Sequence, residues 1–294
     1  MIKKTLLFTN KCSISTTNNQ LVINSDFKNK SIPIEDIGYI VIDNYQTYIS
    51  IPALNELVNN NCAVIICDNK HLPNAMFLNL NSHHIQQEIF KTQINASQPL
   101  KKQLWQHTIK EKIKNQGQLL KVIEKKDNTF EFLASKVLSG DTTNMEAVAA
   151  KFYWKSFFDV DFKRERFGNY PNNFLNYGYA ILRAATARAL SGSGLLNTLG
   201  IHHKSKYNAF ALADDIMEPF RPIVDEAVHT IMQHYDEQKL NTEIKSVLLD
   251  ILTRTVYFKD EQSPLMVALQ KTASSLQQCY SGKRKKIKYP KLWN

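Results

Sequence analysis

The sequence has few cysteines and no long apolar run, and each lack excludes a class of protein. The 294 residues include four cysteines, Cys12, Cys62, Cys67 and Cys279, whose spacing fits no zinc site. In a chain of this length they predict reduced thiols and a cytoplasmic location. No apolar run is long enough to cross a bilayer, and Thr9-Asn10-Lys11 cuts the first apolar stretch too short for a signal peptide. We therefore expect no membrane partner.

Acidic residues are missing from the end of the chain. The formal net charge is +10, and six of the basic residues lie in residues 281–294, which contain no Asp or Glu. A basic balance favours polyanion partners, of which nucleic acid is the commonest. A basic tail is disordered by default. Its aromatic residues Tyr289 and Trp293, beside Leu292, instead predict that it docks on DNA or on a partner subunit.

The hydrophobic pattern changes its period near residue 83, which predicts two domains. Residues 1–80 hold short β-branched runs and a hairpin signal at Asn18-Asn19, so they predict a β-rich domain. Residues 81–98 are expected to be a linker or first helix. Residues 99–280 show the 3.6-residue period of helices. The predicted fold class is α+β: a small β-rich N-terminal domain, a larger all-helical domain and a basic tail at 281–294.

Three stretches of the helical part and one of the β-rich domain give further predictions. Apolar spacing predicts one or two helices between Leu100 and Ile123, with Gly117 as a weak point. A lysine stripe on that segment fits a phosphate backbone, but a solvated face is the favoured interpretation. Small residues around Gly178 predict close helix packing. A further helix is expected over Glu243–Phe258 and, in the β-rich domain, a last strand over Met76–Leu80.

Acidic and histidine side chains gather in residues 199–228 and predict a metal site. Asp215 and Glu218 lie three residues apart, which places both carboxylates on one side of a helix. Two histidines, His202 and His203, precede them. Carboxylates and imidazoles are ligands for Mg²⁺ or Mn²⁺. Glu146 begins a largely apolar helix, where its ordinary role would be to complement the helix dipole. A buried carboxylate needs a partner, and a metal is one possibility.

These residues alone leave three functions open. The first is a metal-dependent DNA integrase, and the second is a DNA repair nuclease that uses the same ligands with water as nucleophile. The third is a non-enzymatic DNA-binding scaffold in which the acidic and histidine side chains form structural salt bridges.

Four strings of residues, found in order over nearly the whole chain, resemble one family. They are Met145-Glu-Ala147, Asn176-Tyr-Gly-Tyr-Ala-Ile-Leu-Arg183, Leu199-Gly-Ile-His-His203 and Asp214-Asp-Ile-Met-Glu-Pro-Phe-Arg-Pro222. The sequence is similar to the CRISPR-associated adaptation integrase, the first-numbered Cas protein, in the form found in type II systems. The second and fourth strings together make the resemblance specific.

The resemblance implies a catalytic metal site and a reaction. Glu146, His203 and Glu218 match the family's ligands for Mg²⁺ or Mn²⁺, and Asp215 matches an acidic position that belongs to the site in some branches. His203 is preferred to His202 because the family's histidine directly precedes a variable turn. The implied enzyme is a metal-dependent endonuclease and integrase. It inserts short DNA fragments as new spacers into a CRISPR array through attack of a 3′-hydroxyl at the edge of a repeat.

Basic residues near these motifs and in the basic segments are expected to contact phosphates. They are Lys204, Lys206, Arg221, Lys163, Arg164, Lys283, Arg284, Lys285 and Lys286. The alternatives are ordinary surface charges and, for Arg221, an internal carboxylate partner. The resemblance further implies double-stranded DNA as substrate, both as captured fragment and as CRISPR repeat. It also implies a homodimer formed through the N-terminal domains, a heterohexamer with a dimer of the second-numbered Cas protein, and contact with other type II Cas proteins.

Overall fold

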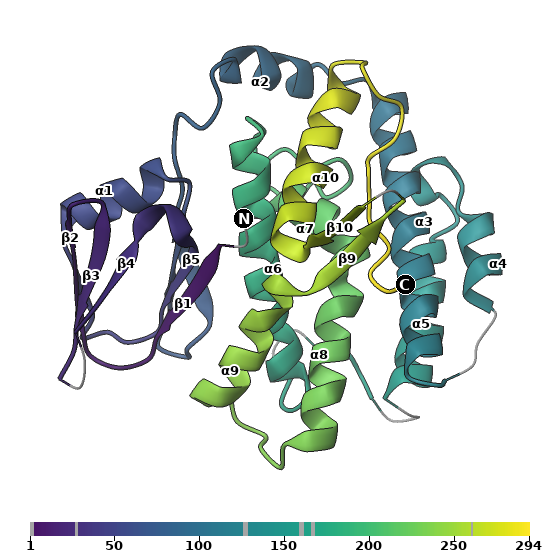
Figure 1. Ribbon diagram of the computed structural model, residues 1–294. Helices are drawn as coiled ribbons and strands as arrows, with labels where there is room; N and C mark the ends of the chain where they lie inside the picture. The colour runs from purple at the N-terminus through teal and green to yellow at the C-terminus, as the bar shows by residue number, and fades with distance from the viewer. Residues whose placement is uncertain (1–2, 27–28, 126–128, 159–161, 166–167, 260) are drawn as a thin grey trace. The chain divides into compact units, whose positions relative to one another are not determined.

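The chain divides into two compact units, Met1–His84 and Ile85–Asn294. The computed structural model describes residues 3–26, 29–125, 129–158, 162–165, 168–259 and 261–294 (Figure 1). The first unit ends close to residue 80, where the hydrophobic pattern predicts a boundary. The first unit contains strands β1–β8, and the second is mostly helical, so the α+β prediction is confirmed.

Two four-stranded sheets form the N-terminal unit. One has the order β1-β5-β7-β8, in which β8 alone is antiparallel to its neighbour, and the other has the order β4-β3-β2-β6. The strand bounds are β1 Lys4–Phe8, β2 Ser13–Thr17, β3 Gln20–Asn24, β4 Asn29–Pro33, β5 Ile37–Ile42, β6 Tyr48–Ile49, β7 Ala63–Cys67 and β8 Pro73–Phe77. The predicted hairpin joins β2 to β3, with Asn18 and Asn19 both at positive φ, as a tight hairpin turn requires.

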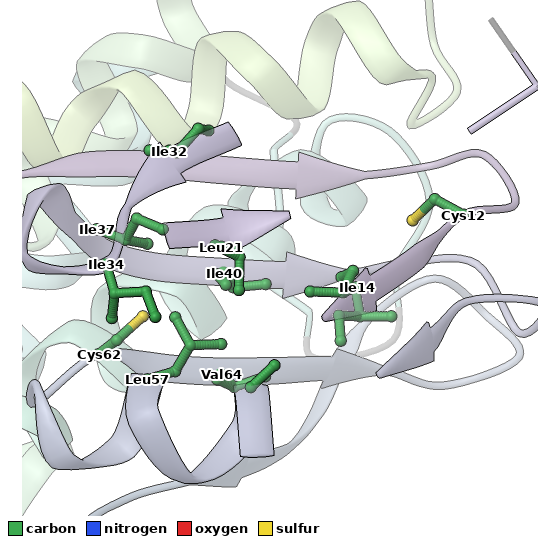
Figure 2. Packing of buried hydrophobic residues seen from close by; sticks show 12 residues of the cluster. Cys12, Ile14, Leu21, Ile32, Ile34, Ile37, Ile40, Leu57, Cys62 and Val64 are labelled. Atoms are coloured by element: carbon green, nitrogen blue, oxygen red, sulfur yellow. The ribbon is translucent and has the colours of Figure 1, made fainter. Parts of the chain in front are cut away.

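Apolar side chains from both sheets and from helix α1 (Ile51–Asn59) form the core of this unit (Figure 2). Ile14 and Leu21 come from one sheet, Ile40 and Val64 from the other, and Leu57 from α1. All six residues of β5 are buried, as expected for a continuous apolar run in the middle of a sheet. The short helix η1 (Ile34–Asp36) connects β4 to β5.

The C-terminal unit is built around α3, a single helix over Gln98–Val122. Ser97 caps its first turn, where Pro99 is well tolerated. The other helices are α2 Gln86–Ile94, α4 Thr129–Lys136, η2 Ser139–Asp141, α5 Met145–Phe157, α6 Asn172–Gly192, α7 Ala211–Met217, η3 Glu218–Phe220, α8 Arg221–His234, α9 Thr242–Leu249, η4 Asp250–Thr253 and α10 Leu265–Tyr280. Helix α3 packs against α4, α5, α7, α8 and η3.

Two glycines allow helices to approach closely. A Cβ atom added to Gly117 of α3 would lie 2.5 Å from Cβ of Phe130 on α4. The weak point predicted at Gly117 is therefore a packing contact within a continuous helix. A Cβ atom added to Gly178 of α6 would lie 2.4 Å from Cγ1 of Val224 on α8, so the expected close packing at Gly178 is confirmed.

The C-terminal unit also contains a hairpin of β9 (Thr255–Phe258) and β10 (Glu261–Pro264), so the all-helical prediction for it is wrong at this point. The helix predicted over Glu243–Phe258 ends at Leu249. Residues 255–258 are β-branched or aromatic, and Val256 and Phe258 are buried on one face, which suits a strand. In the N-terminal unit, the strand predicted over Met76–Leu80 is β8, and it begins at Pro73.

The last fourteen residues, called here the C-terminal strap, pack on the chain's own helical unit (Figure 1). The Tyr289 hydroxyl lies 2.9 Å from Oγ1 of Thr108 on α3, and Leu292 is buried. Lys291 and Tyr257 of β9 exchange backbone hydrogen bonds of 2.8 and 2.9 Å. Docking of the aromatic residues was expected on DNA or a partner subunit. In the structure the strap docks on its own chain instead, because α3 and the hairpin of β9 and β10 offer an apolar surface.

Each of the four cysteines is a buried thiol, and none is in a disulfide. Among the helices that the structure describes, none is long and apolar enough to span a bilayer.

Candidate metal centre and nucleic-acid interface

The predicted metal ligands come from separate elements of the C-terminal unit. Glu146 lies in the first turn of α5, Glu218 begins η3 directly after α7, and His203 lies in the loop before α7. Pro219, which follows Glu218, lies in the first turn of η3 and donates no hydrogen bond there. The three residues come from parts of the chain that are up to 72 residues apart.

A lysine that the sequence did not single out brings Glu146 and Glu218 together. The Nζ atom of Lys112, on α3, lies 2.6 Å from Oε1 of Glu146 and 2.7 Å from Oε2 of Glu218. Lys112 is 8% exposed, and the Glu218 side chain is 4% exposed. Two carboxylates thus meet around one buried positive charge, and of the two only Glu218 is buried as well, since the Glu146 side chain is 27% exposed.

Arg221 neutralises the second oxygen of Glu218. Its Nη2 atom lies 2.9 Å from Oε1 of Glu218, and its guanidinium lies over the Tyr179 ring at 4.7 Å. Arg221 is therefore the internal carboxylate partner, which was the alternative to a phosphate contact. Burial acts to raise the pKa of Glu218, but the charges of Arg221 and Lys112 outweigh burial and hold that pKa below its ordinary value. Glu218 is thus a carboxylate at neutral pH.

His203 is held in orientation by Asp215. Its Nδ1 atom lies 2.5 Å from Oδ1 of the fully buried Asp215. The same carboxylate accepts backbone N–H groups of Ile201, His202 and His203. Both oxygens of Asp215 are engaged, so it positions the histidine rather than presenting an oxygen to a metal. With Nδ1 engaged, Nε2 is the ring nitrogen available as a ligand.

The hydrogen bond to Asp215 also raises the pKa of His203, and burial only partly opposes that effect. A glycine makes the loop possible. A Cβ atom added to Gly200 would lie 2.6 Å from the carbonyl oxygen of His203 and 2.8 Å from Oδ2 of Asp215.

The two adjacent histidines have different surroundings. The His202 ring stacks on Trp105 of α3 with ring centroids 4.2 Å apart and an angle of 2° between the planes. The His203 ring meets the edge of the same indole at 5.9 Å. The His202 ring therefore packs against α3, and this supports the preference for His203 as the ligand.

One face of α3 forms the floor of the site. Trp105 stacks on His202, Thr108 bonds to Tyr289, Lys112 meets the two glutamates, and Asn115 donates to the carbonyl oxygen of Pro219 at 2.7 Å. Their spacing of three, four and three residues places them on one face of a helix. One sequence signal could have revealed the role of Lys112 and Asn115. Both are polar residues on an otherwise apolar helix face, and buried polar groups need partners. The predicted lysine stripe follows other positions of α3.

The residues at this site fit a divalent cation. The buried Oε2 atom of Glu218 has the Lys112 ammonium as its partner at 2.7 Å, and among the residues that the structure describes no other group donates a hydrogen bond to it. Two carboxylates and an imidazole are a donor set for Mg²⁺ or Mn²⁺. Within the described ranges, no three His, Cys, Asp or Glu side chains already stand in a metal-binding arrangement, and Lys112 lies between the glutamates.

The other predicted phosphate contacts fall into three groups. Lys204 and Lys206 are exposed in the His203 loop, and the Lys206 ammonium lies 5.0 Å from the centre of the Tyr207 ring. Lys163 is exposed, whereas Arg164 donates to side-chain oxygens of Asn172 and Asn176 on α6. The third group is exposed in the C-terminal strap: Lys283, Arg284, Lys285 and Lys286. The last three of them line a cavity of about 510 Å³ together with His107 of α3.

A buried acid lies next to this site and was not anticipated. Asp225 of α8 accepts hydrogen bonds from the hydroxyl groups of Tyr153 (2.7 Å) and Tyr179. Burial raises the pKa of Asp225 to about 6, although both hydroxyl groups and Arg221 oppose that effect. Tyr179 is also the ring over which Arg221 lies, so Asp225 belongs to the packing that supports Glu218.

Comparison with known proteins identifies relatives of the whole chain. The family model described as "CRISPR associated protein Cas1" matches residues 5–261. The chain is 36% identical over 302 residues to the "CRISPR-associated endonuclease Cas1" of Neisseria meningitidis serogroup C (strain 8013). That alignment covers 99% of this chain and 97% of the relative.

Solved structures share the fold at lower identity. A chain of a "Casposase bound to integration product" matches with a TM-score of 0.81 and 20% identity, over 97% of this chain and 92% of that one. A chain of a "Cas6-RT-Cas1--Cas2 complex" matches with a TM-score of 0.74 and 20% identity, over 96% of this chain and 35% of that one.

Proposed function

The chain belongs to the Cas1 family of CRISPR-associated proteins, and on that premise we propose that it is a metal-dependent DNA endonuclease and integrase. It inserts short captured DNA fragments as new spacers into a CRISPR array. The observation that carries the proposal is the meeting of Glu146 and Glu218 around one positive charge, with His203 oriented by Asp215 nearby.

The proposed ligands are one carboxylate oxygen each from Glu146 and Glu218, and Nε2 of His203. When bound there, Mg²⁺ or Mn²⁺ would stabilise charge on a scissile phosphate and lower the pKa of an attacking hydroxyl. The fit rests on a donor set of hard oxygens with one imidazole, and on a buried Glu218 oxygen whose partner is itself a cation, the Lys112 ammonium.

The chain's own residues have defined roles in this proposal. Asp215 fixes the His203 ring, and Arg221 holds Glu218 through its other oxygen. Exposed Lys204 and Lys206 lie in the same loop as His203, so they attract phosphates to the site. A fragment's 3′-hydroxyl attacks the phosphodiester at the edge of a repeat and gives up its proton to solvent. The bond from phosphorus to the repeat's 3′-oxygen breaks as the new bond forms, and that departing oxygen takes up a proton from solvent. Water in place of that hydroxyl gives endonuclease activity.

The proposed partners are double-stranded DNA, a second copy of the chain through its N-terminal unit, and a dimer of the second-numbered Cas protein in a heterohexamer. Other type II Cas proteins are proposed as further partners. One structural neighbour is bound to an integration product, which supports DNA as a partner, and another comes from a complex that includes Cas2, which supports the second-numbered Cas protein. Because all four cysteines are free thiols, as in a reducing compartment, we propose a cytoplasmic location.

The test of the proposed function is Glu146→Gln, which keeps the size of the side chain and removes its charge. We expect Mn²⁺-dependent joining of a 3′-hydroxyl duplex to a supercoiled repeat target to fall at least about 100-fold, because even outer-shell changes at metal sites cost about 10- to 100-fold. DNA binding should remain. The matched control is Glu111→Gln, a glutamate on α3 that pairs with exposed Lys114.

Three outcomes would contradict the proposal. Full joining by Glu146→Gln would remove Glu146 from the site. Cleavage by the wild-type protein without joined products would favour the repair nuclease. DNA binding with neither cleavage nor joining would favour the scaffold.

A further inference from the structure

Lys112 occupies an unusual position for a lysine. It is 8% exposed, and its ammonium group contacts one oxygen of each of the two glutamates that are the proposed metal ligands. Lysine is almost never buried unless it is paired. Here the pairing is with the very atoms to which a metal would bind, so one charged group already occupies the region between the carboxylates.

The surroundings hold the helix at Lys112 but leave the end of its side chain adjustable. On the same face of α3, Thr108 bonds to Tyr289 and Asn115 bonds to the carbonyl oxygen of Pro219. The backbone around Lys112 is therefore anchored on both sides. The side chain ends in a flexible four-carbon stem. Rotation of that stem, rather than movement of α3, would carry the ammonium group away from the glutamates.

Electrostatics makes the lysine necessary when no metal is bound. Glu218 is buried, and Arg221 contacts its Oε1 atom, so Oε2 has Lys112 as its cation. Two carboxylates that share a buried site repel each other unless a positive charge lies between them. The Lys112 ammonium supplies that charge. An ammonium group and a divalent cation repel each other and cannot both occupy this place.

We propose that Lys112 is a placeholder for the metal: it holds Glu146 and Glu218 together in the metal-free protein and must leave when a divalent cation binds. The inference rests on the proposed function in one respect, that these two glutamates are metal ligands. The lysine then reduces apparent metal affinity, because only the fraction of molecules with an open site can bind. Removing its charge should tighten metal binding and weaken the metal-free fold.

The test compares Lys112→Met with the wild-type full-length chain, using Mn²⁺ alone as the ligand. Titration calorimetry should give a Kd for Mn²⁺ at least about tenfold lower in Lys112→Met. The melting temperature in EDTA should be several degrees lower, and Mn²⁺ should raise it more than in wild type. Lys112→Arg keeps a positive charge and should bind Mn²⁺ no more tightly than wild type does. Lys114→Met removes a charge two residues away and should change neither measurement.

The outcomes separate this proposal from the proposed function. Wild type and Lys112→Met with equal Kd values would overturn the placeholder role while leaving the metal site intact. Binding of Mn²⁺ by neither protein would overturn both. Binding by Lys112→Met alone would support the placeholder role in its strongest form. If Lys112→Met does not fold, Lys112→Gln carries the same test, since its amide still donates to one carboxylate and its charge is absent.

Discussion

Four acidic residues within twelve positions of one another each have a different kind of partner: Asp214, Asp215, Glu218 and Asp225. The first pairs with an arginine, the second binds loop amides and an imidazole, the third meets a lysine and an arginine, and the fourth accepts from two tyrosines. Residue type alone makes all four candidate metal ligands. The partners show that Glu218 is the one whose two oxygens each meet a different cationic side chain.

Asp225 should make the stability of the protein depend on pH. Burial raises its pKa from 3.8 to about 6, so the folded state holds the proton more tightly than the unfolded chain. This stabilisation is fully present below about pH 4 and is lost as the pH rises through 6. Asn cannot ionise, so the stability of Asp225→Asn relative to wild type should rise by about 2 kcal/mol between pH 4 and pH 8.

Urea unfolding at several pH values measures this effect. The control is Asp250→Asn, at an exposed acid. A constant difference between Asp225→Asn and wild type across that range would show that Asp225 titrates normally.

Gly200 should be required for the orientation of His203. In Gly200→Ala the new Cβ would overlap the His203 carbonyl and the Asp215 carboxylate, which forces the loop away. We expect a loss of about 1–3 kcal/mol in unfolding free energy, as for other overpacked sites. The pKa of His203 should fall toward its ordinary value, because the hydrogen bond to Asp215 is its main cause of elevation.

Thermal unfolding and NMR titration of the His203 ring test that prediction, with Ser205→Ala in the exposed part of the loop as control. An unchanged His203 pKa in a folded Gly200→Ala protein would mean that the loop tolerates the methyl group.

At the scale of elements, α3 links the packing of the C-terminal unit to the candidate metal site. One face carries the residues of the site floor, and another carries Gly117 against α4. A change in how α3 packs therefore acts on the site as well as on stability.

Replacing Gly117 tests the packing of α3. Alanine is a better helix former than glycine by about 1 kcal/mol, so propensity alone would stabilise Gly117→Ala. The added Cβ would lie 2.5 Å from Cβ of Phe130, and overpacking of this kind costs about 1–3 kcal/mol. We expect a net destabilisation in urea unfolding. In a double-mutant cycle with Phe130→Gly, which removes the Cβ atom that the new methyl group would meet, the penalty of Gly117→Ala should disappear. If the two substitutions instead had additive effects on the unfolding free energy, the cost of Gly117→Ala would not come from contact with Phe130.

Elements with a clear hydrophobic period or turn signal were predictable from the sequence. Elements whose conformation depends on tertiary contacts were not. The hairpin at Asn18-Asn19 and the helix that begins at Met145 follow from local chemistry. The hairpin of β9 and β10 was missed because short apolar runs do not separate strand from helix. Lys112 was missed for a related reason: its position on α3 was clear, but only the fold shows that residues 146 and 218 face it.

At the scale of the whole molecule, the basic charge of the C-terminal strap is fixed in place by its buried residues. Ile287 and Leu292 anchor the strap, while residues 283–286 are exposed. A variant in which these four basic residues become Gln should keep its melting temperature, because the anchors remain. Its DNA affinity should depend less steeply on salt, with the slope of log K against log [salt] reduced by up to about 3–4.

Filter binding of a DNA duplex at several salt concentrations measures that slope. The control replaces four exposed lysines elsewhere with Gln: Lys30, Lys70, Lys239 and Lys259. An equal reduction in both variants would show that net charge matters and that the strap has no special role. Complete removal of the strap is a poorer experiment, since it also uncovers the apolar surface under Leu292.

The burial of all four cysteines makes the natural chain suitable for site-selective labelling. Burial raises the pKa of Cys279 to about 11, which leaves little reactive thiolate at neutral pH. A maleimide dye should therefore react with a cysteine introduced at exposed Tyr207 and spare the native thiols. Fluorescence from that position would report on the His203 loop without the need to build a cysteine-free background.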